Sequence, residues 1–328
     1  MSDKLAAKAK KPIKVIVQIP CLNEETTLPL VMATMPTKIP GVDVLEYLII
    51  DDGSTDKTVE VAKKLGVHHV VHHKRNMGLA RSFRDGVERA LELGADIVVN
   101  TDGDNQYPQE KIPELIQPIL DGEADIVVAD RQTAKIAHFS PLKKLLQRFG
   151  SWIVNKAAGT DLPDAASGFR AYSKSALIKI NVVTQFSYCM ETIIQAGNKR
   201  IAITSIPITT NPKTRESRLF KNMWEHIFKS MSAIIRAYMM YKPRVIFISI
   251  AAFFFVLGAI PFLRYFVMFA NDGVSGHLQS LIFGTVCLTA AVISTVAGIL
   301  ADLIHINRIL IEENLEQLKA ARFNRDQN

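Results

Sequence analysis

Residues 1–210 alternate short apolar runs with polar segments, which is the pattern of a soluble α/β domain. Four of the apolar runs have the length and composition of buried strands: residues 14–20, 45–50, 97–100 and 126–129. Helices are predicted between them, as in the four-residue repeat of Leu79, Phe83, Val87 and Leu91. Because the strands are apolar on both faces, the order of elements predicts a mostly parallel, doubly wound α/β sheet.

The hydrophobic pattern changes beyond residue 212. Residues 217–241 place apolar side chains three and four positions apart, with basic residues on the other faces, and predict an amphipathic helix. Such a helix fits a membrane interface, although an ordinary helix packed on a core is the alternative. Two long apolar stretches follow, Val245–Leu263 and Leu278–Leu300, and each is long enough to span a bilayer.

The charges that flank the two predicted spans indicate their orientation. Lys242 and Arg244 precede the first span and Arg308 follows the second, whereas residues 271–277 between the spans carry neither Lys nor Arg. Because basic flanks stay on the cytosolic side, we predict a two-span protein of the cell membrane with its α/β domain in the cytosol.

These patterns divide the chain into five segments. We predict a basic N-terminal tail, an α/β domain, a loop with the amphipathic helix, a pair of spans, and a cytosolic C-terminal helix or tail, at residues 1–12, 13–212, 213–243, 244–306 and 307–328. The C-terminal helix has two open interpretations, packing between subunits and a solvated surface helix.

Composition narrows the class of partner. The chain has 328 residues and a formal net charge of +7, and an anionic membrane surface fits this charge. No RNA- or DNA-binding signature accompanies the charge, so we expect no nucleic acid partner. The three cysteines are far apart, which argues against a disulfide framework or a zinc site. The first residues are charged and lack the apolar core of a secretory signal.

Polar residues follow three of the predicted strands. They are Asn23 and Glu24, Asp51 and Asp52, and the run Asp102–Gln106. The carboxyl ends of parallel strands meet at one edge of a sheet, where doubly wound domains bind their ligands. A single Asp after a strand is ordinary turn chemistry, but three polar clusters at one edge indicate a ligand site. Their oxygen atoms suit Mg²⁺ or Mn²⁺ that is shared with substrate phosphates.

Two common nucleotide-binding motifs are missing from the sequence. No G-x-x-x-x-G-K-[ST] run is present, which excludes a P-loop kinase or ATPase. No G-x-G-x-x-G follows the first strand, which argues against a nicotinamide enzyme. A cluster of four histidines could bind a metal, but alternation along a strand would divide them between opposite faces: His68, His69, His72 and His73.

Together, the motifs resemble those of a known family. The ordered set Ile19–Glu25, Asp51–Asp56, Asn76–Gly78 and Asp102–Gln106 resembles the inverting glycosyltransferases of family 2, which have the GT-A fold. The segment Asp164–Arg170 is similar to the acceptor-side motif of polyprenyl-phosphate glycosyltransferases. That group includes dolichol-phosphate mannose synthases and bacterial undecaprenyl-phosphate glucosyltransferases, and the two predicted spans are similar to those of the bacterial enzymes.

The resemblance implies a role for each motif. The residues that would bind the nucleotide sugar are Pro20, Leu22, Glu24, Asp52 and Asp102, with Asp52 at the base or ribose. Asp104 would ligate Mg²⁺ or Mn²⁺ directly, with help from Gln106, and Asp102 would hold the ribose or the metal shell. The catalytic set that the resemblance implies is Asp104, Asp164 and Arg170.

An acceptor phosphate needs positive charge more than it needs a base. A phosphate monoester is mostly ionised near neutral pH, with a second pKa of about 6, so we expect Asp164 to orient a neighbouring group rather than remove a proton. Arginine binds phosphate bidentately, and basic residues of the predicted acceptor region are therefore candidates for this contact. They are Arg131, Arg170, Lys213, Arg215 and Arg218.

The motifs predict an enzyme that transfers one sugar, with inversion, from a nucleotide sugar to polyprenyl phosphate at the cytosolic membrane face. UDP-glucose is the donor that we expect first, and a GDP-mannose-dependent mannose synthase is the alternative. A catalytically silent membrane scaffold that binds nucleotide sugars is a further interpretation, against which three intact carboxylate clusters argue. A homo-oligomer and a separate flippase are further candidate partners.

Overall fold

The computed structural model describes residues 11–133, 141–183, 188–212, 243–272 and 278–324, together with residues 232 and 239. The predicted amphipathic helix at 217–241 therefore lies, apart from those two residues, outside the described part of the chain. The described residues form two compact units. The first unit comprises the elements up to residue 212 and the end of the last helix from Glu316, and the second comprises the two long C-terminal helices as far as Leu315.

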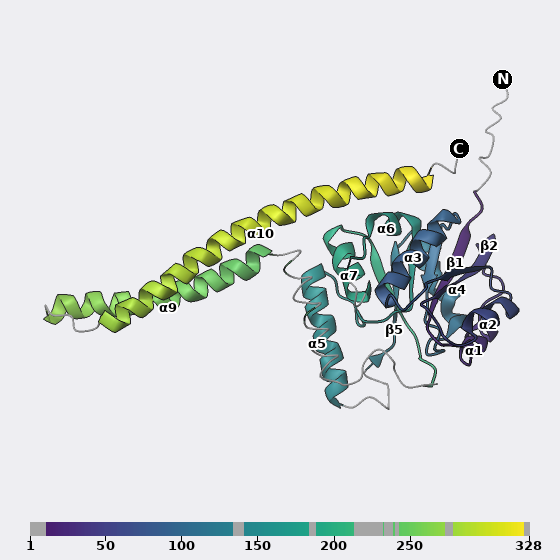
Figure 1. Cartoon of the computed structure of the whole chain (residues 1–328), viewed down its shortest axis with the longest axis horizontal. Coiled ribbons are helices and arrows are strands. Elements are labelled where there is room, and N and C mark those ends of the chain that lie inside the picture. Colours follow the sequence, from purple (N-terminus) through teal and green to yellow (C-terminus); the bar gives the residue numbers. More distant parts are fainter. Residues whose placement is uncertain are drawn as a thin grey trace, which may run out of the picture. The chain divides into compact units, whose positions relative to one another are not determined.

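A seven-stranded sheet runs through the first unit (Figure 1), in the order β3-β2-β1-β4-β6-β5-β7. Its strands are β1 (Lys14–Cys21), β2 (Val44–Asp51), β3 (His69–His72), β4 (Ile97–Asn100), β5 (Ile126–Asp130), β6 (Arg170–Ser173) and β7 (Ile203–Pro207). Neighbouring strands are parallel except at β6, which runs antiparallel to both β4 and β5. The predicted mostly parallel α/β sheet is thus confirmed.

Helices connect the strands of this unit. They are α1 (Leu28–Ala33), α2 (Thr58–Lys64), α3 (Leu79–Glu92), α4 (Ile112–Leu120), α5 (Pro141–Ala158), α6 (Lys174–Lys179) and α7 (Tyr188–Asn198), with the short 3-10 turn η1 (Gln109–Lys111) before α4. On one face of the sheet, Val15 and Val17 of β1 share a buried core with Leu28 of α1 and Leu115 of α4.

The opposite face of the sheet packs on α3. A Cβ added at Gly86 of this helix would lie 2.6 Å from Oε1 of Gln18 and 2.7 Å from Cδ1 of Ile50, so the helix approaches the strands closely at that point. Side chains alternate between the two faces of a strand, and both faces are covered here. This double burial explains why the strands are apolar throughout.

The second unit consists of α9 (Pro243–Asp272) and the first part of α10 (Leu278–Asn324). By length and composition, each of these helices could cross a membrane. They approach closely at two glycines, because a Cβ added at Gly258 would lie 2.9 Å from the carbonyl oxygen of Gly284. We expected a separate helix from residue 307, whereas α10 continues without a break to Asn324.

Candidate active site

The loop that follows β4 packs directly on the loop that follows β1. A Cβ added at Gly103 would lie 3.0 Å from Sγ of Cys21, 3.3 Å from Cγ of Glu24 and 3.4 Å from the carbonyl oxygen of Pro20. A side chain at this position would therefore press on the neighbouring loop. The structure thus brings the Asp102–Gln106 motif together with the first motif, from which the sequence predicts part of the nucleotide pocket.

Carboxylates from the end of β2 and from the loops after β1 and β4 act on the buried thiol of Cys21, next to Leu22. Burial, with the added charges of Glu24, Asp51 and Asp102, raises the pKa of this thiol well above its ordinary value. The thiol is therefore neutral and has no nucleophilic role at neutral pH. Register pairs Cys21 with Asp51, and Gly103, the neighbour of Asp102, packs on Cys21 and Glu24, so these acidic residues belong to one edge of the sheet.

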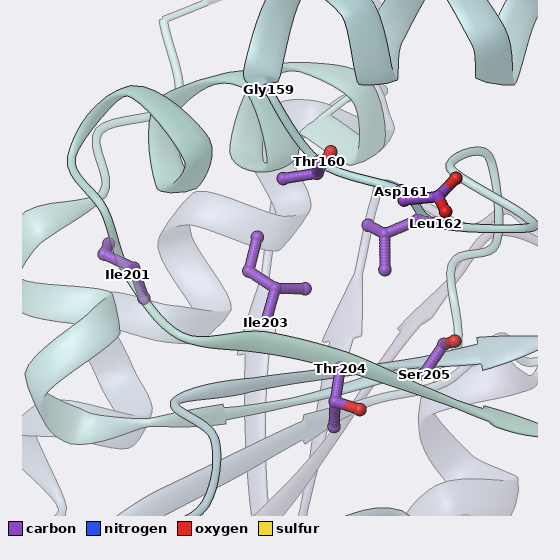
Figure 2. Close-up of a pocket in the computed structure, with 8 residues that line it drawn as sticks. All are labelled: Gly159, Thr160, Asp161, Leu162, Ile201, Ile203, Thr204 and Ser205. Carbon is purple, nitrogen blue, oxygen red and sulfur yellow. The ribbon is translucent and has the colours of Figure 1, made fainter.

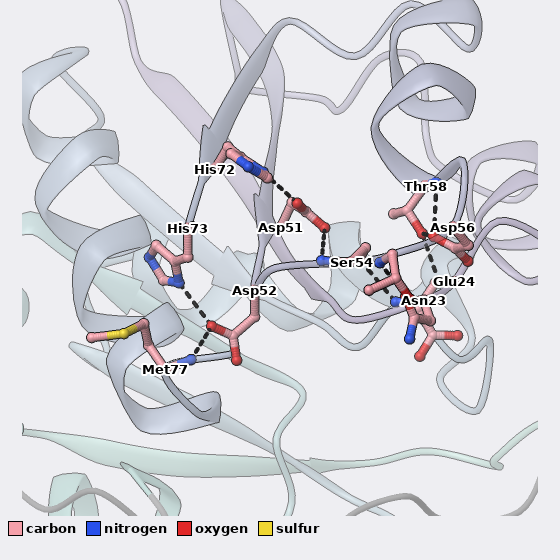
Figure 3. Close-up of polar contacts among 11 residues, drawn as sticks. Asn23, Glu24, Asp51, Asp52, Ser54, Asp56, Thr58, His72, His73 and Met77 are labelled. Carbon is pink, nitrogen blue, oxygen red and sulfur yellow. Dashed lines mark hydrogen bonds and ion pairs between the residues drawn. The ribbon is translucent and has the colours of Figure 1, made fainter. Parts of the chain in front are cut away.

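Hydrogen bonds tie the loop after β1 to the loop after β2 (Figure 3). Oδ1 of Asn23 accepts from the backbone N–H of Thr55 at 2.7 Å, and the backbone N–H of Asn23 donates to Oγ of Ser54 at 2.8 Å. The backbone N–H of Glu24 donates to Oγ1 of Thr58 at 2.8 Å. Asn23 has a φ of 56°, a left-handed conformation that asparagine tolerates better than most residues. These bonds fix the first motif against the second.

Asp52, directly after β2, is held by the loop that precedes α3 (Figure 3). Its Oδ1 accepts from the backbone N–H of Met77 at 2.8 Å, and its Oδ2 accepts from the backbone N–H of Gly78 at 2.9 Å. The adjacent Gly53 has a φ of 78°, and a Cβ added there would lie 2.6 Å from the carbonyl carbon of Arg75. The second and third motifs of the sequence therefore form one structural piece.

The Asp102–Gln106 loop is fixed by bonds within it and by a distant residue. Oδ1 of Asp104 accepts from the backbone N–H of Gln106 at 3.1 Å. Nδ2 of Asn211 donates to the carbonyl oxygens of Asn105 and Tyr107, at 3.1 and 3.3 Å. No sequence pattern marks Asn211, because its partners are far away along the chain. Only the structure reveals it as a candidate site residue.

The donor set of this loop fits a hard divalent cation. Asp102, Asp104 and Gln106 are half-buried, and their side chains offer carboxylate and amide oxygen atoms. Oxygen-only sites suit Mg²⁺ or Mn²⁺, and Mg²⁺ usually completes its shell with water and substrate phosphates. Among the described residues, no three His, Cys, Asp or Glu side chains form a metal cluster.

The histidine cluster is divided among separate carboxylates of β2 and the loop after it. The contacts include His69 with Glu46 at 2.8 Å, His72 with Asp51 at 2.6 Å and His73 with Asp52 at 2.8 Å. In the register of β2 and β3, His72 is opposite Asp51, whereas His69 is opposite Leu48, two residues beyond Glu46. The alternation expected along a strand thus separates the histidines, and each makes its own contact.

The predicted acceptor residues Arg131 and Asp164 form an ion pair. Nε of Arg131 donates to Oδ2 of Asp164 at 2.6 Å, and Nη2 donates to Oδ1 at 2.9 Å. The side chain of Asp164 is 3% exposed and that of Arg131 is 18% exposed. Burial alone would raise the pKa of Asp164, but the charge and hydrogen bonds of Arg131 lower it below its usual value. Asp164 is therefore ionised and engaged with Arg131.

Arg170, expected at the acceptor phosphate, lies in the protein interior instead. Its side chain is fully buried. The guanidinium donates to the carbonyl oxygens of three residues at distances of 2.7 to 2.9 Å: Ser167, Cys189 and Ala165. These bonds hold the backbone of the acceptor-side motif on α7, so a direct contact of Arg170 with a phosphate is not supported. A sequence motif alone does not tell which arginine points inward.

A buried polar network joins the acceptor-side motif to the end of β4. Nδ2 of Asn100 donates to the carbonyl oxygen of Gly168 at 3.0 Å, while Oδ1 of Asn100 accepts from Nε2 of Gln18 at 2.9 Å. The backbone N–H of Gly168 donates to the hydroxyl of Tyr107 at 3.0 Å, and burial raises the pKa of this phenol, which stays neutral. Sequence reasoning missed both Asn100 and Tyr107, although an asparagine that ends an apolar strand was a usable signal.

The remaining basic candidates, Lys213, Arg215 and Arg218, lie outside the described residues. A cavity of about 360 Å³ lies between β7 and the turn after α5 (Figure 2). It is lined by residues 159–162, Ile201 and residues 203–205, and the predicted site residues are not among them. The candidate active site is therefore the edge where the loops after β1, β2 and β4 meet the acceptor-side motif.

Comparison with known proteins gives a consistent picture. A family model described as "Glycosyl transferase family 2" matches residues 16–180. A UDP-N-acetylglucosamine–dolichyl-phosphate N-acetylglucosaminyltransferase of Methanococcus voltae is 30% identical over 213 residues, which are 58% of this chain and 83% of that protein. An undecaprenyl-phosphate mannosyltransferase of Micrococcus luteus is 28% identical over 207 residues, or 60% of this chain and 83% of that protein.

A solved structure supports the fold assignment. Glucosyl-3-phosphoglycerate synthase of Mycobacterium tuberculosis, in complex with Mn²⁺, UDP and phosphoglyceric acid, aligns with a TM-score of 0.52. The alignment covers 68% of this chain and 78% of that chain at 21% identity. At this identity the likeness concerns the fold alone.

Proposed function

The chain belongs to glycosyltransferase family 2, and we propose that it transfers a single sugar from a nucleotide sugar to a polyprenyl phosphate at the cytosolic face of a membrane. The observation that carries this proposal is the contact among three motifs. Gly103 lies against the first motif, and the last residues of β1 and β2, Cys21 and Asp51, are paired in the sheet. The relatives that act on dolichyl and undecaprenyl phosphates support the lipid acceptor.

The nucleotide sugar is proposed to bind along this edge. Pro20, Leu22 and Glu24 would line the nucleotide pocket, and Asp52 would contact the base or ribose. Asp102, Asp104 and Gln106 would hold Mg²⁺ or Mn²⁺, which when bound would neutralise charge on the departing diphosphate. The loop bonds of Asn211 and of Gln106 keep these donors in one place before a ligand arrives.

The acceptor phosphate is proposed to meet Arg131. A lipid phosphate is already ionised near neutral pH, so an oxygen of the phosphate can attack the anomeric carbon as the bond to the diphosphate breaks. Arg131 is the more exposed member of its ion pair, and both oxygens of Asp164 hold its guanidinium in one orientation. Asp164 would therefore position Arg131 rather than remove a proton. Lys213, Arg215 and Arg218 stay candidates for the same phosphate.

The sugar and the nucleotide of the donor are a separate part of the proposal. We propose UDP-glucose as the first donor to test, and the relatives named for N-acetylglucosamine and mannose transfer make UDP-N-acetylglucosamine and GDP-mannose the competing ones. Both apolar helices would anchor the enzyme, with the basic residues Lys242, Arg244 and Arg308 on the cytosolic side.

Thermal-shift measurements on the full chain in detergent test the donor site. A ligand that binds the folded state raises the melting temperature, by more when it binds more tightly. We expect one of the three nucleotide sugars to raise the melting temperature in the presence of Mn²⁺ or Mg²⁺, and to lose this effect in Asp104→Asn. No shift with any of the three donors and either metal would contradict the proposed function.

A further inference from the structure

His73 bridges Asp52 and helix α3. Its Nδ1 lies 2.8 Å from Oδ1 of Asp52 (Figure 3), and its Nε2 lies 3.2 Å from Oδ2 of Asp85 on α3. The backbone N–H of His73 donates to the carbonyl oxygen of Asp51 at 2.9 Å, which fixes the residue beside the end of β2. The imidazole is 10% exposed; its Nδ1 is hydrogen-bonded to Asp52, whereas Nε2 makes no hydrogen bond with the described residues and only lies near Asp85.

Asp85, the second contact of His73, is held by two arginines of its own helix. Oδ2 of Asp85 accepts from Nε of Arg81 at 2.7 Å, and Oδ1 of Asp85 lies 3.5 Å from Nε of Arg84. All three residues belong to α3, which begins directly after Gly78, and the backbone N–H of Gly78 also binds Asp52. Helix α3 thus reaches Asp52 by two routes, through the backbone before its first turn and through the His73 ring.

The bonds of Asp52 indicate which of its oxygens is available to a ligand. Oδ1 accepts from Met77 and contacts His73, and these two partners match the two lone pairs of a carboxylate oxygen. Among the hydrogen bonds of the described residues, Oδ2 accepts one, from the backbone N–H of Gly78. An additional donor, such as an N–H of a base or a ribose hydroxyl, would therefore bind at Oδ2.

We propose that His73 is a positioning residue for nucleotide binding: it fixes the Asp52 carboxylate relative to α3 so that Oδ2 faces the nucleotide. This inference rests on the proposed function, in which Asp52 contacts the base or ribose. His73 itself touches Asp52 and Asp85 and acts through them. A hydrogen-bond donor that holds a carboxylate pre-organises it, so less ordering remains to be done when the nucleotide binds.

Three substitutions separate a positioning role from a general structural one. In His73→Asn the amide nitrogen occupies nearly the place of Nδ1, so the bond to Asp52 is retained. In His73→Gln the amide reaches the place of Nε2, next to Asp85, and the bond to Asp52 is lost. His73→Ala removes both. Because the Asn and Gln variants both lose the ring, a difference between them reports the bond to Asp52.

His69 supplies a matched control. It belongs to β3, which His73 directly follows, and contacts a β2 carboxylate, Glu46, at 2.8 Å, but Glu46 lies before the buried end of the strand that leads into the site. His69→Ala therefore removes a comparable ion pair away from Asp52. We expect it to leave nucleotide affinity unchanged.

The test is the dissociation constant of UDP and of GDP, each with Mn²⁺, measured by calorimetry on the full-length chain and its variants. For the nucleotide that the unmodified chain binds, we expect His73→Ala and His73→Gln to bind about tenfold more weakly, which is the scale of one charge-assisted bond. His73→Asn should stay within about threefold of the unmodified chain. Melting temperatures without nucleotide identify any variant that fails to fold, and the Asn–Gln pair then decides between folded variants.

The outcomes are distinct. Equal affinities for the Asn, Gln and unmodified chains would overturn the positioning role while leaving the proposed function in place. A folded His73→Asn variant that binds the nucleotide as weakly as His73→Gln would also overturn the positioning role. If the unmodified chain binds neither UDP nor GDP with Mn²⁺, the proposed function fails, and this inference fails with it.

Discussion

Gly168 of the proposed acceptor-side motif lies against Asp102 of the proposed metal motif. A Cβ added at Gly168 would lie 3.5 Å from Oδ2 of Asp102 and 3.1 Å from the hydroxyl of Tyr188. The carbonyl oxygen of Gly168 also accepts from Asn100, which precedes the metal motif in the chain. Two motifs that are far apart in the sequence thus share one surface, and a change at Gly168 should be felt at the metal site.

We predict that Gly168→Ala lowers the rate of sugar transfer about tenfold or more with little loss of stability. The added methyl group would lie 3.1 Å from the hydroxyl of Tyr188, which must shift. This hydroxyl accepts from Asn100, just before the proposed metal motif, so the geometry of the site changes, and a small misplacement costs a large factor in rate. Gly150→Ala is the control, because a Cβ at Gly150 in α5 meets nothing within 4 Å. Initial rates and melting temperatures of both variants provide the measurement, and equal rates for the two would contradict the prediction.

We predict that Asp164→Asn destabilises the chain by about 3 kcal/mol yet keeps a measurable part of its transfer activity. Removing one partner of a largely buried ion pair leaves Arg131 without its counter-charge. An amide oxygen can still accept one bond from Arg131, so orientation is partly retained. Chemical unfolding and transfer rates are the measurements. Near-complete loss of activity in a folded variant would instead mean that the negative charge of Asp164 is essential.

The same pair predicts an acid-sensitive stability. The pKa of Asp164 is lowered in the folded chain, because Arg131 outweighs the effect of burial. A carboxyl with a lowered folded pKa stabilises the fold above its unfolded pKa of about 4, and this contribution is lost as the pH falls below that value. The stability difference between the unmodified chain and Asp164→Asn should therefore shrink from pH 5 toward pH 3. A difference that stays constant over this range would show that the pair is not its source.

We predict that Arg170→Lys lowers the melting temperature strongly. The buried guanidinium donates to the carbonyl oxygens of Ala165, Ser167 and Cys189, and an ammonium group cannot reach all three in the same geometry. Each buried group left unpaired costs about 1–3 kcal/mol. Differential scanning calorimetry gives the result. A variant of normal stability with a raised KM for the lipid would return Arg170 to the acceptor site.

The end of α10 belongs to the first unit and should bind it more firmly at high pH. Lys319 donates to the carbonyl oxygen of Ile180 at 2.9 Å, and burial, with repulsion from Lys199, lowers the pKa of Lys319 to about 8. A lysine whose folded pKa is lowered penalises docking below that pKa, and the penalty disappears as the pH rises from 8 toward its unfolded pKa of about 10.4.

We therefore predict slower hydrogen exchange of the amides at 316–323 at pH 9.5 than at pH 7, after correction for the intrinsic exchange rates. Lys319→Gln keeps a donor to Ile180 without a charge that titrates, and its corrected exchange should not depend on pH. Equal pH dependence in the two chains would assign the effect to another group.

The sequence patterns were sufficient for the central strands and for the three polar clusters, because short apolar runs and the residues after them depend on local information. The antiparallel strand β6 was missed, since its residues Arg170–Ser173 are few, mixed in character and part of a motif. The continuation of α10 was missed as well. No proline interrupts this helix, but polar residues beyond the span suggested a separate element.

Some features of the candidate site were likewise predictable from the sequence, and others were not. The sequence placed Asp102 and Asp164 in ligand-binding motifs, and the structure puts their loops in contact through Gly168. It could not show that Arg170 faces inward, because the partners of Arg170 are backbone carbonyls of another helix and of its own loop. Asn211 was equally hidden, since its role depends on a contact between distant segments.

Transfer of a labelled sugar to a lipid tests the central claim most directly. The full-length chain in membrane vesicles is incubated with Mn²⁺, undecaprenyl or dolichyl phosphate, and each radiolabelled donor in turn: UDP-glucose, UDP-N-acetylglucosamine and GDP-mannose. We predict a chloroform-soluble labelled product with one donor, dependent on both the metal and the lipid phosphate, and absent with Asp104→Asn. A folded chain that forms no such product with any of these donors, or forms it equally well with Asp104→Asn, would contradict the account.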